Sequence, residues 1–156
     1  MRDEPSATAT KVVLYVTHGG KLLVFLEPKY PKIALQVPGG TVEGGEELEA
    51  AARRELLEET GIGEIASMYQ LGQRVYHFNF RGVRQLHTRH YFHLTLKGEP
   101  PARWSHWETD SSLGFGPIEF ALFWVGFEQA SRELGYGFAD MLPELRRVMT
   151  EGSARA

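Results

Sequence analysis

The sequence predicts a single α/β domain in which a mixed β-sheet is flanked by helices. Two observations carry this prediction. The chain has 156 residues, about the size of one domain, and runs of β-forming residues alternate with segments of helical pattern. A hydrophobic content of 42% and a charged content of 24% are typical of a globular protein. We therefore expect one domain over residues 11–150, between a flexible N-terminal tail at 1–10 and a C-terminal tail at 151–156.

The N-terminal part of the domain is expected to begin with a β-hairpin. Lys11–Thr17 and Lys21–Glu27 are rich in β-formers, and the glycine-bearing segment 18–20 between them suits a tight turn. A short third strand is expected at Ile33–Val37, just before a Pro-Gly-Gly sequence.

A helix is expected over Glu46–Thr60, because Gly61 follows it in the position where a left-handed residue ends many helices. The remaining elements follow in chain order. We expect strands at 67–80, 86–96, 103–108 and 118–125, a loop at 110–117, and helices at 127–134 and 138–150.

Charge and composition exclude several classes of function. The net charge of −3 provides no global basic field, which disfavours nucleic acid as a partner. The absence of cysteine excludes disulfides, thiolate zinc sites and a cysteine nucleophile. The N-terminus has no apolar signal region, and no run approaches the 18 apolar residues of a membrane span. We expect a cytoplasmic protein without a membrane partner.

The expected helix at 46–60 carries acidic residues on its apolar face. At about 100° per residue, Glu55, Glu58 and Glu59 project from the same half as Leu48 and Ala52. A solvated acidic face should instead lie opposite these apolar residues. Like charges held this close cost roughly 2–3 kcal/mol per pair, so the cluster predicts either protonation or a bound cation. Oxygen ligands alone favour Mg²⁺, with Mn²⁺ as its substitute, and Mg²⁺ commonly retains substrate phosphates as ligands.

Residues 40–62, GTVEGGEELEAAARRELLEETGI, resemble the signature of the Nudix hydrolase family. The defined positions of that signature are all filled here, by Gly40, Glu46, Arg54, Glu55, Leu56, Glu58, Glu59, Gly61 and Ile62. The resemblance implies the family's α/β/α sandwich fold and Mg²⁺-dependent hydrolysis of the diphosphate linkage in a nucleoside diphosphate joined to another group. Many relatives carry an aromatic residue shortly before the Pro-Gly-Gly sequence. This chain has Leu35-Gln36-Val37 there, which we interpret as a change in packing.

The resemblance also implies roles for single residues. Arg54 would brace a carboxylate of the cluster, and it joins three glutamates as the implied catalytic set, Arg54, Glu55, Glu58 and Glu59. The implied metal ligands are Gly39 through its carbonyl, Glu46 as an outer or supporting ligand, Glu55, Glu58 and Glu59. The residues alone leave two alternatives open. Arg54 could be a surface partner of Glu58, and Glu46 could act on the helix dipole.

The signature does not identify the group attached to the diphosphate. Specificity is expected from segments 28–33, 81–87 and 104–116, and the candidate substrate residues there are Tyr30, Arg84 and Trp107. Tyr76 lies roughly where dinucleoside-polyphosphate hydrolases tend to have a tyrosine, with a core residue as the alternative. Glu108 is one of two candidates outside the helix for a base or an additional metal ligand; Glu119 is the other.

Two alternative functions remain open at this point. The chain could act on the 5′ end of RNA, or it could be a non-catalytic module that senses a nucleotide. The retention of every signature carboxylate argues against the second. The expected partner is a small nucleotide-type diphosphate, and a homodimer is left open.

Overall fold

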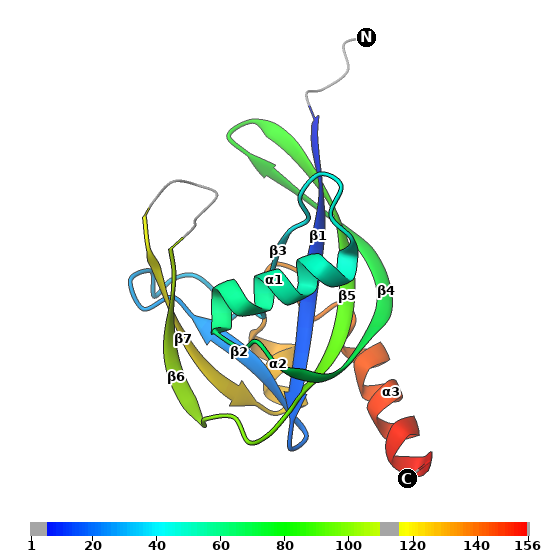
Figure 1. Cartoon of the computed structure of the whole chain (residues 1–156). Helices are drawn as coiled ribbons and strands as arrows, with labels where there is room; N and C mark the ends of the chain where they lie inside the picture. The colour runs from blue at the N-terminus through cyan, green and yellow to red at the C-terminus, as the bar shows by residue number, and fades with distance from the viewer. Residues whose placement is uncertain (1–5, 110–115, 156) are drawn as a thin grey trace.

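The computed structural model describes residues 6–109 and 116–155, which form a twisted sheet between helices (Figure 1). The strands are β1 (Ser6–His18), β2 (Lys21–Leu26), β3 (Gly39–Thr41), β4 (Ile65–Phe80), β5 (Val83–Leu96), β6 (Arg103–Glu108) and β7 (Ile118–Val125). The helices are α1 (Leu48–Thr60), α2 (Phe127–Glu133) and α3 (Leu142–Arg155). None of the helices within these described ranges is long and apolar enough to cross a membrane.

The sheet is mixed, as the sequence predicts. Its strand order is β4-β5-β1-β2-β7-β6, and β3 pairs with β1 outside this path. β1 and β5 are parallel, whereas the other strand pairs are antiparallel. α1 packs on one core cluster that includes Val12, Leu14 and Phe92, while residues of α2 and α3 join a second cluster around Val13 and Tyr15. Because neighbouring residues of a strand point to opposite faces, the helices cover both faces of the sheet.

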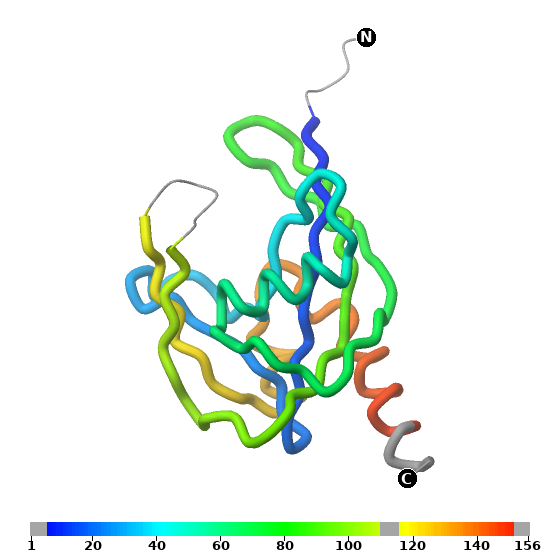
Figure 2. Tube along the Cα trace, in the orientation of Figure 1, coloured from blue at the N-terminus to red at the C-terminus, as the bar shows by residue number. Residues whose placement is uncertain are grey.

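β1 begins earlier than the sequence analysis predicts. Residues 6–10, expected to be part of a flexible tail, pair in parallel with residues 84–88 of β5. β4 and β5 run as a long hairpin past the body of the sheet (Figure 2), and this extension gives the start of β1 a partner. The hairpin closes on Arg81 and Gly82, both with positive φ, as the central residues of a type I′ turn require.

The expected strand at Ile33–Val37 is wrong. Its residues make only isolated bridges, from Gln36 to Phe25 and from Leu35 to Leu134. Because neighbouring residues pair with two different segments, no continuous strand forms here. The third strand lies at Gly39–Thr41, where glycine permits close packing on β1. A Cβ on Gly39 would stand 2.4 Å from the carbonyl oxygen of Val12.

The C-terminal helix differs from its expected bounds at both ends. The sequence predicts 138–150, but residues 138–141 form turns and α3 continues to Arg155, into the expected tail. Side-chain hydrogen bonds hold the preceding turn against β1, since the hydroxyl of Tyr15 donates to the carbonyl of Phe138 and accepts from the amide of Met141. Most of the predicted loop at 110–117 lies outside the described residues.

The Tyr15 hydroxyl should therefore contribute to stability. Tyr15→Phe removes a buried group that satisfies two backbone partners, and we expect it to lower the free energy of unfolding by about 1–3 kcal/mol. Chemical denaturation measures this change. Tyr69→Phe is the matched control because Tyr69 is 63% exposed. Equal stability of the two variants would contradict the expectation.

Candidate active site

The acidic residues of α1 lie partly inside the protein, as the helical pattern predicts. Glu55 and Glu59 are each only 7% exposed, and the Glu58 side chain is 30% exposed. The same helix buries Ala52 and Leu56 against the sheet. The packing of these apolar residues therefore draws the neighbouring carboxylates into the interior, where their negative charge needs compensation.

Arg54 provides part of that compensation. Its Nη1 donates to Glu55 Oε1 at 2.9 Å and to Glu58 Oε2 at 3.2 Å. Its Nη2 also donates to the carbonyl oxygen of Thr41 at 2.9 Å, which ties the helix to β3. Arg54 is thus more than a surface partner of Glu58, because one guanidinium orients several carboxylates and a backbone carbonyl.

Glu46 is the strongest partner of Arg54. Nε and Nη2 of Arg54 reach its two carboxylate oxygens, both at 2.8 Å, in a bidentate pair. The Arg54 hydrogen bonds, helped by the Glu43 amide, lower the pKa of Glu46 to about 2. Glu46 lies before the first residue of α1, and its contacts are those of a residue that positions Arg54.

Glu108, the last residue of β6, joins the acidic residues of α1. One carboxylate oxygen each from Glu55, Glu58 and Glu108 lie within 4.8 Å of one another. β6 packs against α1, and this contact brings a residue about fifty positions downstream to the helix. Three converging carboxylates are a suitable oxygen donor set for a hard divalent cation.

Burial also changes the protonation of this cluster. Desolvation raises the pKa of Glu55 to about 7, against the opposing effect of Arg54. Desolvation raises the pKa of Glu59 as well, although the Gly39 amide acts in the opposite direction. In the absence of a cation, protons therefore supply part of the positive charge that the cluster needs.

The glycines of β3 allow the close approach of these acidic side chains to the backbone. The amide of Gly39 donates to Glu59 Oε1 at 2.6 Å. A Cβ on Gly40 would lie 2.2–2.4 Å from the carboxyl atoms of Glu55, so only glycine leaves room for that group. A Cβ on Gly44 would meet no atom within 4 Å, so this glycine of the following loop is under no such constraint.

A cavity of about 770 Å³ adjoins the acidic site and shares Gly39, Gly40 and Glu59 with it. This volume is within the range of small-molecule sites. Aromatic rings form much of the lining, from β2, from the β4 strand of the long hairpin and from the segment before α3. They are Phe25, Tyr76, Phe78, Phe80, Tyr136 and Phe138.

Two basic residues lie in the cavity on neighbouring strands. Lys11 of β1 and Arg89 of β5 are register partners, and both line the cavity. Arg89 is only 6% exposed; its guanidinium carbon lies 3.9 Å from the ring centroid of Tyr76 and 4.3 Å from that of Phe138. Burial lowers the pKa of Lys11, while Glu55 raises it and Arg89 lowers it. The cavity therefore places two basic side chains close to the acidic cluster.

The three substrate residues named from the sequence do not line this cavity. Tyr30 is exposed in the loop after β2, Trp107 is 55% exposed on β6, and Arg84 lies on β5 with its Nη2 3.4 Å from Nδ1 of His77. The expected specificity segments contribute only Ile33 and His87 to the described lining. Residues 110–115, inside the expected segment 104–116, lie outside the described part of the chain.

Sequence reasoning missed most of the cavity. Tyr76, for which the sequence allows either a substrate role or a core role, does line the cavity. Lys11, Arg89 and Phe138 give no local signal, because strand pairing and chain return bring them together. Tyr136 did have a signal in the sequence, because it stands between two glycines; the structure shows that its own φ is positive, at 56°.

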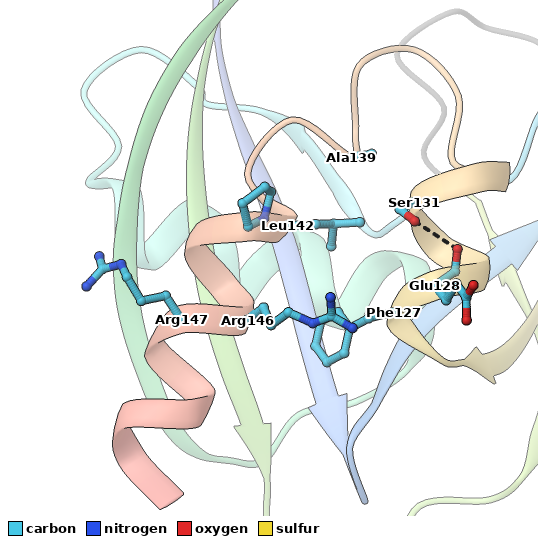
Figure 3. A pocket seen from close by; sticks show the side chains of 8 residues that line it. Phe127, Glu128, Ser131, Ala139, Leu142, Arg146 and Arg147 are labelled. Atoms are coloured by element: carbon cyan, nitrogen blue, oxygen red, sulfur yellow. Dashed lines mark hydrogen bonds between the residues drawn. The ribbon is translucent and has the colours of Figure 1, made fainter. Parts of the chain in front are cut away.

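A second cavity, of about 740 Å³, lies between α2 and α3 (Figure 3). Arg146 extends toward Phe127, with its guanidinium carbon 5.8 Å from the ring centroid, and Arg147 points away from that ring. This cavity shares no lining residue with the acidic site or with the first cavity.

Comparison with known proteins gives a consistent result. The model of the NUDIX domain family matches residues 5–145 of the chain. Among solved structures, the chain is similar to the MutT NUDIX hydrolase from Burkholderia pseudomallei, with 19% identity, a TM-score of 0.63, and coverage of 89% of this chain and 98% of that one. It is also similar to the NUDIX domain of Shewanella oneidensis NrtR complexed with ADP ribose, with 16% identity, a TM-score of 0.63, and coverage of 94% and 90%. None of the curated proteins compared with the chain matches it significantly.

The raised pKa of Glu55 should make the stability of the metal-free protein depend on pH. The native state keeps this proton up to about pH 7, whereas the unfolded chain loses it near its ordinary pKa of 4.5, so stability falls as pH rises between these values. Burial lowers the pKa of His87 and of His93, which gives an opposite slope. The quantity to measure is therefore the Tm of the wild type minus the Tm of Glu55→Gln, both in EDTA. This difference should fall as the pH rises from about 5 to about 7.5, because only the wild type loses the proton at position 55. A constant difference would contradict the raised pKa.

Gly40→Ala should impair the site while preserving the fold. The added methyl group meets the mobile end of Glu55, so the carboxylate is expected to move and the backbone to stay. In the wild type, Mg²⁺ at a hundredfold excess over its Kd should add about 2.7 kcal/mol to stability. We expect Gly40→Ala to lose most of this Mg²⁺-induced rise in Tm, and Gly44→Ala to retain it. An undiminished rise in Gly40→Ala would argue that Glu55 does not hold metal.

Proposed function

Because the chain belongs to the NUDIX domain family, we propose that it is a Mg²⁺-dependent pyrophosphohydrolase that cleaves the diphosphate linkage of a nucleoside diphosphate joined to another group. Mn²⁺ is the expected substitute ion. The observation that carries this proposal is the convergence of Glu55, Glu58 and Glu108 beside a cavity that contains two basic residues.

The residues present fit a divalent cation. The cluster offers only carboxylate oxygens, which suit Mg²⁺ and Mn²⁺, and its charge is partly compensated by a single guanidinium. Glu55 and Glu58 would hold metal directly with Glu108, while Glu59 and the Gly39 carbonyl would complete the set on the cavity side. Bound divalent cations would supply the charge that neutralises the diphosphate and would activate the attacking water.

The other residues of the signature orient these ligands. Arg54 fixes one oxygen each of Glu55 and Glu58, and Glu46 holds Arg54 in place through its bidentate pair. We therefore assign Glu46 a positioning role. Glu108 lies outside the signature and is a candidate for the base as well as for a ligand, because its carboxylate faces the cluster from a different element.

The cavity would hold the rest of the substrate. Lys11 interacts electrostatically with Glu55, Glu59 and Arg89, so it lies near both the acidic site and the buried guanidinium. A phosphate that extends from the metal site into the cavity would lie within reach of Lys11. The aromatic lining next to Arg89 then suits the planar group of a nucleotide.

A nucleotide-sensing module without catalysis is the second candidate. The NUDIX domain of Shewanella oneidensis NrtR was solved in complex with ADP ribose, so the fold accommodates such a ligand in that protein. Every signature carboxylate is present here, and three carboxylates converge, which favours hydrolysis. A small nucleotide remains the proposed partner, and the cytoplasmic location remains a prediction from the sequence.

The proposal predicts a shared loss of turnover when a metal-holding carboxylate is neutralised. With Mg²⁺, the protein should hydrolyse at least one member of a panel of nucleoside triphosphates, dinucleoside polyphosphates, nucleotide sugars, ADP-ribose and coenzyme A. Glu58→Gln and Glu59→Gln should each lower kcat by about a hundredfold or more, because Gln retains shape and loses the charge that holds metal. In Glu59→Gln the amide oxygen can still accept from Gly39, so the fold should persist.

Glu49→Gln is the matched control, since Glu49 lies exposed in the first turn of the same helix. It should leave kcat unchanged. Hydrolysis that is equally fast in all three variants would remove the basis for the proposed site. Binding of panel members without any hydrolysis by the wild type would favour the sensing module.

A further inference from the structure

One pair of polar side chains in the cavity has no part in the metal site. Nε2 of Gln36 donates to Glu27 Oε2 at 3.0 Å, and both residues line the cavity. Glu27 follows β2, and Gln36 is bridged to Phe25 by two backbone hydrogen bonds of 2.9 and 3.2 Å. The backbone therefore holds both members of the pair in place.

The pair lies on the other side of β1 from the hairpin residues that line the cavity. The strand order places β4 and β5 on one side of β1 and β2 on the other. A planar group among the rings of β4 would thus have basic residues of β1 and β5 near it, and the Glu27–Gln36 pair opposite the hairpin. The phosphate end of a nucleotide would lie near the basic residues, and the hydrogen-bonding edge of its base would lie near the Glu27–Gln36 pair.

The hydrogen bond between Gln36 and Glu27 determines which donors and acceptors the two side chains still offer to a ligand. An ionised carboxylate only accepts, and no lysine or arginine within the described residues forms an ion pair with Glu27. The contact with Glu27 fixes which end of the Gln36 amide carries the nitrogen, and it leaves a second N–H on that nitrogen. The pair therefore offers an acceptor next to a donor.

We propose that Glu27 and Gln36 read the edge of the base and select one with an exocyclic amino group, such as adenine or cytosine. In these bases an amino donor lies beside a ring-nitrogen acceptor, which complements Glu27 and Gln36 respectively. Uracil and hypoxanthine, seated in the position and orientation that suit cytosine and adenine, would present a carbonyl to the Glu27 carboxylate and a ring N–H to the Gln36 N–H, so an acceptor would face an acceptor and a donor would face a donor. This inference rests on the proposed function, because it assigns the base-recognition part of the same nucleotide site.

Because the Glu27 carboxylate is partly buried, binding of a mismatched base costs free energy. Desolvation raises the pKa of Glu27, and the Gln36 hydrogen bond opposes this effect. A partly desolvated acceptor that meets a carbonyl instead of a donor loses its water without a replacement partner. Sites built around such hydrogen bonds reject the mismatched analogue more strongly than apolar pockets do.

Nucleoside monophosphates test the inference without any turnover. CMP and UMP, and likewise AMP and IMP, differ in the amino–carbonyl exchange and the accompanying ring-nitrogen proton. Calorimetric titration without metal should show the amino member of at least one pair bound about tenfold tighter or more. Glu27→Gln should reduce this preference to within about threefold, because the amide can turn its own N–H toward a carbonyl.

Glu133→Gln is the matched control. Glu133 accepts a hydrogen bond from Gln129 on α2, so it forms the same type of pair at an exposed position outside the cavity lining. This variant should keep the wild-type preference. Equal binding within both pairs by the wild type, or no binding of any of the four up to millimolar concentration, would overturn the inference without recourse to a variant.

Turnover of the matching triphosphates with Mg²⁺ separates this inference from the proposed function. Hydrolysis of CTP and UTP, and of ATP and ITP, at equal kcat/KM, together with equal monophosphate binding, would overturn base selection and leave the hydrolase intact. Discrimination among the monophosphates with no cleavage of any panel compound would support base selection and overturn the hydrolase.

Discussion

Mutual repulsion of carboxylates is the constraint on which the site and its surroundings depend. Oxygens of Glu55, Glu58 and Glu108 lie within 4.8 Å of one another, and each like-charged pair at such a distance opposes folding by about 3 kcal/mol at an effective dielectric near 20. Arg54 offsets part of this cost through hydrogen bonds to two of the three carboxylates and to β3. Burial of Glu55 and Glu59 adds a desolvation cost to their charged forms, and the protonation that it favours relieves part of the repulsion.

The same constraint explains the division of labour across the site. Residues of α1 and β3 crowd negative charge together, and they offer nothing that distinguishes one diphosphate compound from another. The neighbouring cavity contains two basic residues side by side, Lys11 and Arg89, and aromatic rings near them. In the proposed function, chemistry and selectivity therefore belong to different elements, which meet where Gly39 and Gly40 border both the acidic cluster and the cavity.

The sequence predicts local features of this protein better than remote contacts. The 46–60 segment predicts its helix and its buried acidic face because 3.6-residue periodicity is a local property, and the hairpin at 11–27 follows from strand pattern and glycines. The strand expected at 33–37 is wrong because Leu35 and Gln36 bridge to two different partners. Gln36, interpreted as a packing change, lines the cavity with Glu27, since only chain return brings the two together.

The turn before α3 contributes the last wall of the cavity, and it is tied to distant parts of the chain. The Tyr15 hydroxyl binds the Phe138 carbonyl across 123 positions, and the Arg89 guanidinium binds the Tyr136 carbonyl across 47. During synthesis, every carboxylate of the acidic cluster emerges before this wall does. A chain shortened before residue 136 would retain every carboxylate of the cluster, but it would lose this wall of the cavity together with the buried core residues Met141, Leu142 and Leu145. The last wall of the cavity and the acidic cluster thus come from separate parts of the chain, and only the folded protein brings them together.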